Sequence, residues 1–247
     1  MSDLETESRV FGGTARRTAP SRLGVVVVHD LVAAIVTGEV RPGDLLPTEA
    51  ELCEHFGVSR TVIRESVKRI EEKGMVKVTQ GRGTVVTDER HWNILDHVVL
   101  SALIENDATL GVLDEVASIR AELESVMARD AAAKRTDPQV VLLRDALDRM
   151  RDTIDDSERF GDQDIAFHGV VMAMSEHIIA RGIARRLVDE ARQNSARFRT
   201  TPGPDAHRLT IEEHDRILRA IEAGDAAAAA DAMRDHINRA WDRRRSK

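Results

Sequence analysis

Apolar residues recur at helical spacing along most of this chain, and strand-like runs are confined to one short stretch. In the first third, the pattern predicts helices over residues 22–37, over a short segment ending near residue 56, and over residues 59–73. Two β-prone runs, residues 75–79 and 84–87, flank a glycine-containing turn. Three helices followed by a hairpin predict a winged helix-turn-helix.

From residue 110 onward the apolar spacing is helical throughout. The predicted helices cover residues 110–134, 137–155, 157–175, 178–198, 210–224 and 225–243. Asp137-Pro138 is read as the start of the second of these helices, and Thr210-x-x-Glu213 as a capping box that opens the fifth. The chain is therefore expected to be mainly α, with an N-terminal winged helix-turn-helix followed by an all-α helical bundle.

Changes in composition along the chain suggest four segments. Residues 1–20 are polar and lack a period, so we expect a disordered arm. Residues 21–88 would form the winged helix-turn-helix, residues 89–109 a linker and docking helix, and residues 110–243 an all-α domain that binds effector and metal.

The predicted helix over residues 59–73 has one apolar and one basic side. Its polar side carries Arg60, Thr61, Arg64 and Lys68. Between Ser59 and Arg82 there are seven Lys or Arg and three Glu, a local charge of +4. Such a helix can enter the DNA major groove by its N-terminal end, although a solvated basic face would give the same pattern. The adjacent β-hairpin favours the DNA interpretation, because its glycines allow close approach to phosphate.

Composition limits the remaining possibilities. The chain has 247 residues, 42% of them hydrophobic, and a net charge of −7, which does not exclude DNA binding because phosphate meets the local field. The single cysteine, Cys53, rules out an internal disulfide and fits a reducing compartment. No apolar run is long enough to span a bilayer, and the N-terminus does not look like a signal peptide, so we expect a cytoplasmic protein without a membrane segment.

The first third resembles the DNA-binding domain of the GntR family of bacterial transcription regulators. The resemblance rests on Pro42-Gly43, Leu46-Pro47-x-Glu49, Phe56-Gly57-Val58-Ser59-Arg60-x-x-x-Arg64-Glu65, Gly74-x-Val76 and Gly81-Arg82-Gly83-Thr84. It implies DNA contacts from Ser59, Arg60, Thr61 and Arg64 on the recognition helix and from Gln80 and Gly81 at the wing tip. Ala50 departs from the family, because many relatives carry a DNA-contacting arginine there.

Four side chains in the second domain are candidate metal ligands. Asp164 and His168 are four residues apart and share one helix face, while His214 and His236 lie on later helices. Three imidazoles and one carboxylate suit Zn, Ni or a similar divalent ion. Because the chain contains nine histidines, spacing alone leaves satisfied or exposed histidines as an alternative.

Residues 112–240 resemble the FCD ligand-binding domain of the FadR-like branch of that family. The matching pieces are Arg120-x-x-Leu123-Glu124, Asp164-x-x-Phe167-His168, Glu213-His214-x-x-Ile217-x-x-Ala220-Ile221-x-x-Gly224-Asp225 and Met233-x-x-His236. The resemblance implies that Asp164, His168, His214 and His236 hold a divalent ion, with Zn favoured. The ion would anchor a small organic acid, whose carboxylate Arg120 could bind; an ion pair of Arg120 with Glu124 is the alternative.

We therefore expect a metabolite-responsive regulator, a repressor that binds a palindromic DNA operator as a homodimer and is not an enzyme. We expect a two-fold symmetric operator because one winged helix-turn-helix covers one half-site and a homodimer carries two of them. Two alternatives remain at this point: the same regulator without metal and with a fatty acyl-CoA type ligand, or a metal-dependent hydrolase that uses the same Asp and His set. The hydrolase lacks an obvious base, since Glu213 points about 100° away from His214 around the helix.

Overall fold

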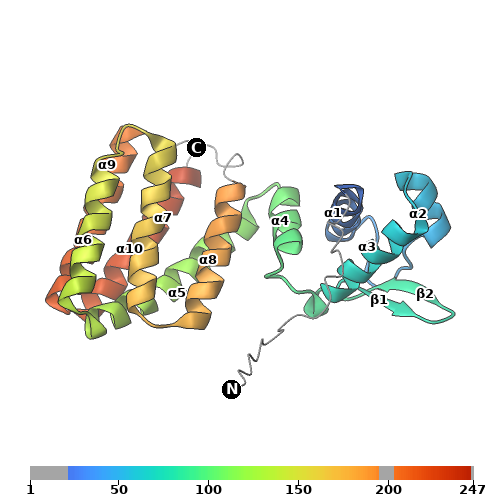
Figure 1. Ribbon diagram of the computed structural model, residues 1–247, viewed down its shortest axis with the longest axis horizontal. Coiled ribbons are helices and arrows are strands. Elements are labelled where there is room, and N and C mark those ends of the chain that lie inside the picture. Colours follow the sequence, from blue (N-terminus) through green and yellow to red (C-terminus); the bar gives the residue numbers. More distant parts are fainter. Residues whose placement is uncertain (1–21, 195–202, 246–247) are drawn as a thin grey trace, which may run out of the picture. The chain divides into compact units, whose positions relative to one another are not determined.

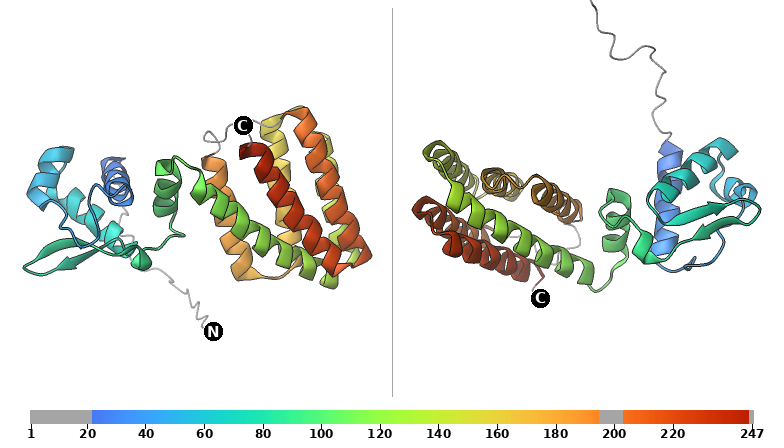
Figure 2. Two further views of the ribbon diagram at one scale, coloured as in Figure 1. Left: turned by 180° about the vertical axis from the view of Figure 1, so that it is seen from behind. Right: turned by 90° about the horizontal axis from the view of Figure 1, so that it is seen from below.

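The computed structural model of the protein describes residues 22–194 and 203–245, which divide into two compact units between Asn93 and Ile94. Figures 1 and 2 show the elements of each unit. The elements are α1 (Arg22–Val36), α2 (Glu49–Phe56), α3 (Arg60–Glu72), β1 (Val76–Thr79), β2 (Gly83–Val86), η1 (Glu89–His91), α4 (His97–Asn106), α5 (Gly111–Lys134), α6 (Asp137–Arg151), α7 (Ser157–Met174), α8 (Ile178–Gln193), α9 (Pro204–Ala223) and α10 (Ala226–Arg245). The predicted arm, residues 1–20, and the predicted end of α8 at residue 198 lie outside the described residues.

The first unit is a winged helix-turn-helix, as its apolar pattern predicted. Helix α3 packs against α1 and α2, and β1 follows it directly. The buried side chains include Val32, Ile35, Ile63, Ile70, Met75 and Val86. These come from α1, α3, β2 and the residue before β1, so a single small core holds the reading helix against the hairpin.

The turn between α2 and α3 is specified locally. Gly57 ends α2 in the left-handed conformation, with φ of 62°, which glycine adopts without steric cost. Ser59 then caps α3, because its hydroxyl accepts a hydrogen bond from the backbone N–H of Val62. Both features confirm the sequence prediction for this turn.

Strands β1 and β2 form an antiparallel hairpin in which Val76 pairs with Val86 and Thr79 with Gly83. The segment before α2 lies along β2, because Leu45 forms a β-bridge with Val85 and Leu46 donates its N–H to the carbonyl of Thr84. The wing is therefore braced from inside its own unit.

Gly74, between α3 and β1, has no room for a side chain. Its φ is +76°, and a Cβ added there would lie 2.0 Å from the carbonyl oxygen of His91 in η1. The Gly74→Ala variant is expected to destabilise the first unit by about 2–5 kcal/mol, the sum of a left-handed alanine and a forced backbone shift. Hydrogen–deuterium exchange of α3 and β1 amides in the full-length protein measures this change.

Gly57→Ala is the matched control for that variant. Its φ of +62° is also left-handed, but nothing lies within 4 Å of an added Cβ. It should cost only about 1–2 kcal/mol. Equal exchange rates in the two variants would show that the approach of His91 does not constrain position 74.

The second unit is an all-α bundle, which confirms the predicted fold class. Helix α5 packs against α7, α8, α9 and α10, and most extensively against α10 (Figure 1). Its core is formed by small and long apolar side chains that include Ala128, Leu147, Met150, Phe167, Ile217 and Ile237. Alanines on α5 let neighbouring helices approach closely, so polar side chains from several helices can meet inside the bundle.

One predicted helix start and one predicted helix end in the second unit were wrong. Helix α6 begins at Asp137 as predicted, but its N-cap is Thr136, whose backbone N–H and hydroxyl both donate to Gln139. It ends at Arg151 rather than near residue 155. Helix α9 begins at Pro204, so Thr210 and Glu213 lie inside it and form no capping box. Thr210 instead donates its hydroxyl to the carbonyl of Ala206, one turn earlier. The predicted cap of α10 was right, because Asp225 accepts the N–H of Ala228.

Helix α4 is fastened to the bundle by a buried carboxylate. Glu190 of α8 has no exposed surface; it accepts a hydrogen bond from the hydroxyl of Ser101 at 2.7 Å and contacts Nδ1 of His97 at 2.5 Å. Because one buried carboxyl group contacts two α4 side chains, α4 belongs structurally to the second unit. Among the described residues, no helix is long and apolar enough to cross a membrane.

Candidate functional site

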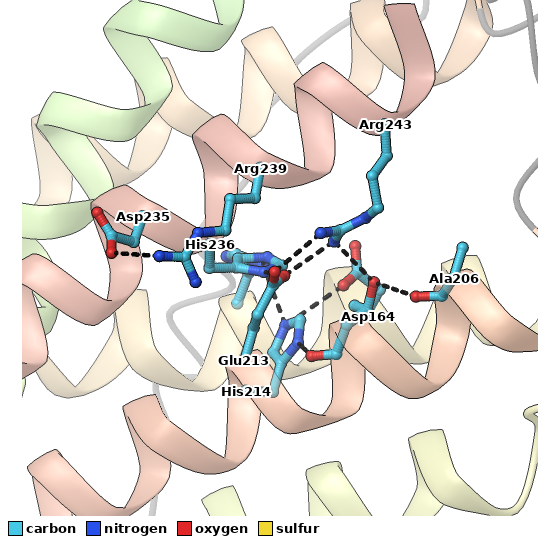
Figure 3. A network of polar contacts seen from close by, with 10 residues as sticks. Asp164, Ala206, Glu213, His214, Asp235, His236, Arg239 and Arg243 are labelled. Atoms are coloured by element: carbon cyan, nitrogen blue, oxygen red, sulfur yellow. Dashed lines mark hydrogen bonds and ion pairs between the residues drawn. The ribbon is translucent and has the colours of Figure 1, made fainter. Parts of the chain in front are cut away.

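The four predicted metal ligands meet inside the second unit. Asp164 and His168 come from α7, His214 from α9 and His236 from α10. One ligand atom of each residue lies within 4.8 Å of the ligand atoms of the others. The three histidines are at most 3% exposed, and Asp164 is partly exposed. Figure 3 shows Asp164, His214 and His236. The spacing of Asp164 and His168 and the resemblance of the later segments thus identified a set that folding brings together.

A surrounding oxygen atom fixes the orientation of each imidazole. The Nδ1 contacts are His168 to Glu124 Oε2 at 2.5 Å, His214 to the carbonyl oxygen of Thr210 at 2.8 Å, and His236 to Glu213 Oε2 at 2.9 Å. A carbonyl or carboxylate oxygen only accepts, so each Nδ1 carries the proton. The Nε2 atom of each ring is therefore the one available to a ligand, as in metal sites whose histidines are held by an outer carboxylate or carbonyl.

The Nε2 atoms converge without a hydrogen bond to satisfy them. Nε2 of His168 lies 3.2 Å from that of His236 and 3.3 Å from that of His214. Such pairs cannot bond unless a proton or a cation lies among them. Asp164 Oδ1 is buried and has no hydrogen-bond partner, although it is 3.3 Å from His214 Nε2, because that nitrogen has no proton to donate. These four atoms fit a divalent cation.

The electrostatics of the set agree with this fit. Burial alone would raise the carboxyl pKa values, but Arg120 and His168 lower the pKa of Glu124 to about 2, and the three histidines and Arg244 lower that of Asp164 to about 2. Burial lowers the pKa of His214 to about 4 and that of His236 well below its usual value. Metal binding requires deprotonated ligands, and at neutral pH Asp164, His214 and His236 meet that requirement.

The pKa of His168 is shifted in the opposite direction. Burial alone would lower it, but the charge of Glu124 and its contact with Nδ1 raise it. Glu124 therefore orients this ring and also increases the basicity of the nitrogen that faces the cluster.

A cavity of about 900 Å³ opens beside the cluster. Asp164, His168 and His236 line one part of it, and apolar side chains such as Val116 and Met172 line another. The cavity also has an unusual concentration of guanidinium groups, contributed by Arg120, Arg185, Arg192, Arg243 and Arg244. A ligand in this space would meet the metal-binding set and several cations together, which favours an anion.

Arg120, the predicted effector-binding residue, lines this cavity and is also ion-paired. Its Nε donates to Glu124 Oε1 at 2.9 Å, as the spacing of four residues allowed. Among the described residues, no partner bonds its two terminal nitrogens. The ion pair therefore leaves the fork of the guanidinium free for a carboxylate.

Sequence reasoning did not connect three residues, Glu124, Glu213 and Arg243, with the cluster. Glu124 orients His168, and Glu213 orients His236. Both terminal nitrogens of Arg243 donate to Glu213, at 2.8 Å each, as Figure 3 shows for these two residues. The position of Glu213 next to His214 in the sequence did not reveal its role, because Glu213 contacts His236, which lies on another helix. Arg120-x-x-x-Glu124 did carry a local signal, but only for the ion pair.

The six predicted DNA contacts all lie on the surface of the first unit. Ser59, Arg60, Thr61 and Arg64 are exposed at the N-terminal half of α3, opposite the buried side that holds Ile63. Gln80 and Gly81 are exposed in the turn between β1 and β2. The hydroxyl of Ser59 also caps α3, so the same side chain would serve the helix and the DNA.

A shallow groove of about 510 Å³ lies between α3 and the wing. Arg64 and Lys68 of α3 and Arg82 of the wing line it, which places three cations around one surface depression. Arg64 is also bound to Glu49 of α2, since its Nε donates to both carboxylate oxygens at 2.9 Å. Glu49 and Glu71 line the same groove, so three cations and two carboxylates leave it a formal charge of +1, a sign that favours phosphate.

Comparison with known proteins identifies both units. Residues 23–86 match the family of bacterial regulatory proteins called the gntR family, and residues 115–239 match the FCD domain. The two matches cover most of the first unit and the helical bundle. They also contain all of the predicted DNA-contacting, metal-binding and effector-binding residues.

Relatives with known names are transcription regulators. The galactonate operon transcriptional repressor of Escherichia coli (strain K12) is 31% identical over 83% of this chain and 90% of its own length. The regulator LutR of Bacillus subtilis (strain 168) is 31% identical over 84% and 94%. The repressor NanR of Citrobacter rodentium (strain ICC168) is 28% identical over 96% and 92%.

A solved structure agrees with the fold. The structure titled for Lar, which controls expression of the agr system of Listeria monocytogenes, has a TM-score of 0.55 and 16% identity over 90% of this chain and 96% of that chain. The named relatives are regulators rather than enzymes, and the two matched domains are those of a DNA-binding regulator that senses a small molecule. The chain therefore belongs to the GntR family, in its FadR-like branch with an FCD domain, and is a transcription regulator.

Proposed function

We propose that this regulator is a repressor that binds a palindromic operator as a homodimer and responds to a small carboxylate or hydroxy acid. A divalent ion, Zn in preference to Ni, would be held by Asp164, His168, His214 and His236. The observation that carries this proposal is the convergence of three Nε2 atoms and one buried carboxylate oxygen beside a cavity rich in arginine. A bound ion would supply a Lewis acid for an effector oxygen.

The charges that line the cavity support an acidic effector. Arg120 offers two terminal nitrogens, in a geometry that matches the two oxygens of a carboxylate. Ser157 and Thr210 also line the cavity and add polar side chains to its wall. The name of one relative points the same way, since galactonate is a carboxylate with several hydroxyl groups.

The DNA side of the proposal rests on α3 and the wing. Ser59, Arg60, Thr61 and Arg64 would enter the major groove, while Gln80 and Gly81 would approach the backbone or minor groove. One such reader covers one half-site, and two readers in a homodimer would cover a palindrome. Two relatives are named as repressors, which supports the same direction of control here.

A thermal-shift screen of small organic acids tests the effector and the metal together. In metal-loaded full-length protein, an acid at about 100 times its Kd should stabilise the folded state by about 2.7 kcal/mol. That corresponds to a Tm increase of roughly 5–11 °C for a domain of this size. A chelator should remove the increase, because the acid would lose the ion that anchors it.

The screen includes a control variant and an alternative ligand. Arg120→Ala should lose the shift, whereas Arg144→Ala, an arginine paired with Glu222 away from the cavity, should keep it. If no acid raises Tm, and a fatty acyl-CoA raises it equally with and without chelator, the effector is of the acyl-CoA type and the proposed acid site is wrong.

A further inference from the structure

Arg64 of α3 and Glu49 of α2 form an unusual pair on the predicted DNA surface. The Nε of Arg64 donates to both oxygens of the Glu49 carboxylate, at 2.9 Å each. The residues are 15 positions apart, so the pair bridges the two helices of the helix-turn-helix. Both side chains are open to solvent, with 67% of the Arg64 side chain and 43% of the Glu49 side chain exposed.

The ion pair with Glu49 uses one N–H group of Arg64 and leaves the others available to DNA. A guanidinium has five N–H groups, of which one is on Nε and four are on the terminal nitrogens. Glu49 occupies the single Nε donor. Among the described residues, no partner bonds the terminal nitrogens of Arg64. Those two nitrogens can donate in parallel to O6 and N7 of guanine, which is the arrangement that identifies this base in the major groove.

Glu49 is itself held in place by the start of α2. The preceding residue, Thr48, donates its backbone N–H to Glu51 Oε2 at 2.7 Å, and its hydroxyl accepts the N–H of Glu51 at 3.3 Å. The next turn is anchored by Leu52, which is buried. The carboxylate therefore projects from a fixed helical turn and can restrict the rotamers of a long side chain.

The negative charge of Glu49 shows that this residue does not act by attracting DNA. A carboxylate at the DNA surface repels phosphate, and it also repels O6 and N7 of guanine because it only accepts hydrogen bonds. Glu49 therefore weakens binding to DNA of any sequence. Glu49 compensates for this repulsion by holding the Arg64 side chain in the conformation that contacts a base. The side chain then loses less conformational entropy when the protein binds DNA.

We propose that Glu49 is a positioning residue that aims the terminal nitrogens of Arg64 at guanine and so increases discrimination between DNA sequences. This inference rests on the proposed contact of Arg64 with a base. It also gives the second helix of this chain a role in recognition, although Ala50 carries no donor to DNA.

The experiment compares Glu49→Gln with the unchanged protein on two duplexes. The first duplex carries a site selected from random oligonucleotides by the full-length protein. The second is identical except that one guanine is replaced by another base. That guanine is the one that the unchanged protein distinguishes from other bases and the Arg64→Ala variant does not. Glu49→Gln should reduce the ratio of the two affinities by about 3- to 10-fold, the effect of freeing one long side chain. It should also bind an unrelated duplex more tightly, because a negative charge has been removed.

Two further variants separate the geometric role from charge. Glu49→Asp keeps the charge but shortens the side chain, so it should lose discrimination without binding the unrelated duplex more tightly. Glu54→Gln removes an equivalent exposed charge from the same helix and should leave the ratio unchanged.

The outcomes distinguish this inference from the function on which it rests. If Glu49→Gln keeps full discrimination while Arg64→Ala loses it, Glu49 does not position Arg64. If Arg64→Ala also keeps full discrimination at every guanine of the selected site, Arg64 reads no base and the proposed DNA contact fails first. If Glu54→Gln lost as much discrimination as Glu49→Gln, the effect would come from the removed charge alone, and the positioning role would be wrong.

Discussion

Replacing Arg64 by alanine is expected to abolish sequence-specific DNA binding while leaving the fold intact. A bidentate contact with guanine contributes about 1–3 kcal/mol of discrimination, so two half-sites would lose about 2–6 kcal/mol, roughly 30- to 20,000-fold in affinity. The fold should survive because the Arg64 side chain is 67% exposed and, within the part of the chain that the structure describes, hydrogen-bonds only to Glu49. A gel-shift titration with a selected duplex measures the loss, and circular dichroism monitors the fold.

Arg90 provides the matched control for this variant. It is an exposed arginine of the same unit and, like Arg64, binds a nearby carboxylate, that of Asp88, but it lies in η1 rather than on α3. Arg90→Ala should bind the selected duplex like the unchanged protein. An unaltered affinity in Arg64→Ala would contradict the assignment of α3 as the reading helix.

Removing the proposed ion should have the second large effect, and it should be visible without any assay of DNA binding. Elemental analysis of full-length protein should find about one divalent ion per chain. The His214→Ala and His236→Ala variants should lose it, because each imidazole directs its Nε2 into the cluster. At a free-metal concentration about 1,000 times Kd, binding stabilises the folded state by about 4 kcal/mol. Chelation should therefore lower Tm by roughly 8–16 °C.

His177 tests whether the effect belongs to the cluster. This histidine lies in the same unit and contacts Asp130 Oδ2 at 2.6 Å, but it is outside the cluster. His177→Ala should retain the ion and its sensitivity to chelator. Purified protein that contains no metal, takes up none on addition of Zn or Ni, and unfolds at the same temperature with chelator would refute the proposed metal site.

The features that the sequence predicted well are those set by neighbouring residues. Gly57 and Ser59 specify the turn before α3 by their own backbone and hydroxyl chemistry, and the spacing of Asp164 and His168 places both on one helix face. Bringing His214 and His236 to the same point depends on how three helices pack. The periodicity of a single helix carries no such information, and the resemblance to the FCD domain supplied it.

The failures have the same origin. Thr210-x-x-Glu213 fits the local pattern of a capping box, but α9 extends back to Pro204, and Glu213 is used instead by His236 and Arg243. The pairing of Arg64 with Glu49 was also invisible, because the two residues meet only after α2 and α3 have packed. Local motifs thus predicted elements, whereas the partners of charged side chains required the tertiary structure.

Glu124, the carboxylate that contacts His168, connects the candidate metal site to α5. Together with the ligands of α7, α9 and α10, it joins four helices of the bundle at one point. With the ion proposed here, the supply of that metal would govern how often these helices separate and how fast proteases degrade the chain. A deficit of even 1–2 kcal/mol changes steady-state protein levels about several-fold. Bacteria starved of the metal would then contain fewer copies of the regulator, and the genes it controls would respond to nutrition even when the effector concentration is constant.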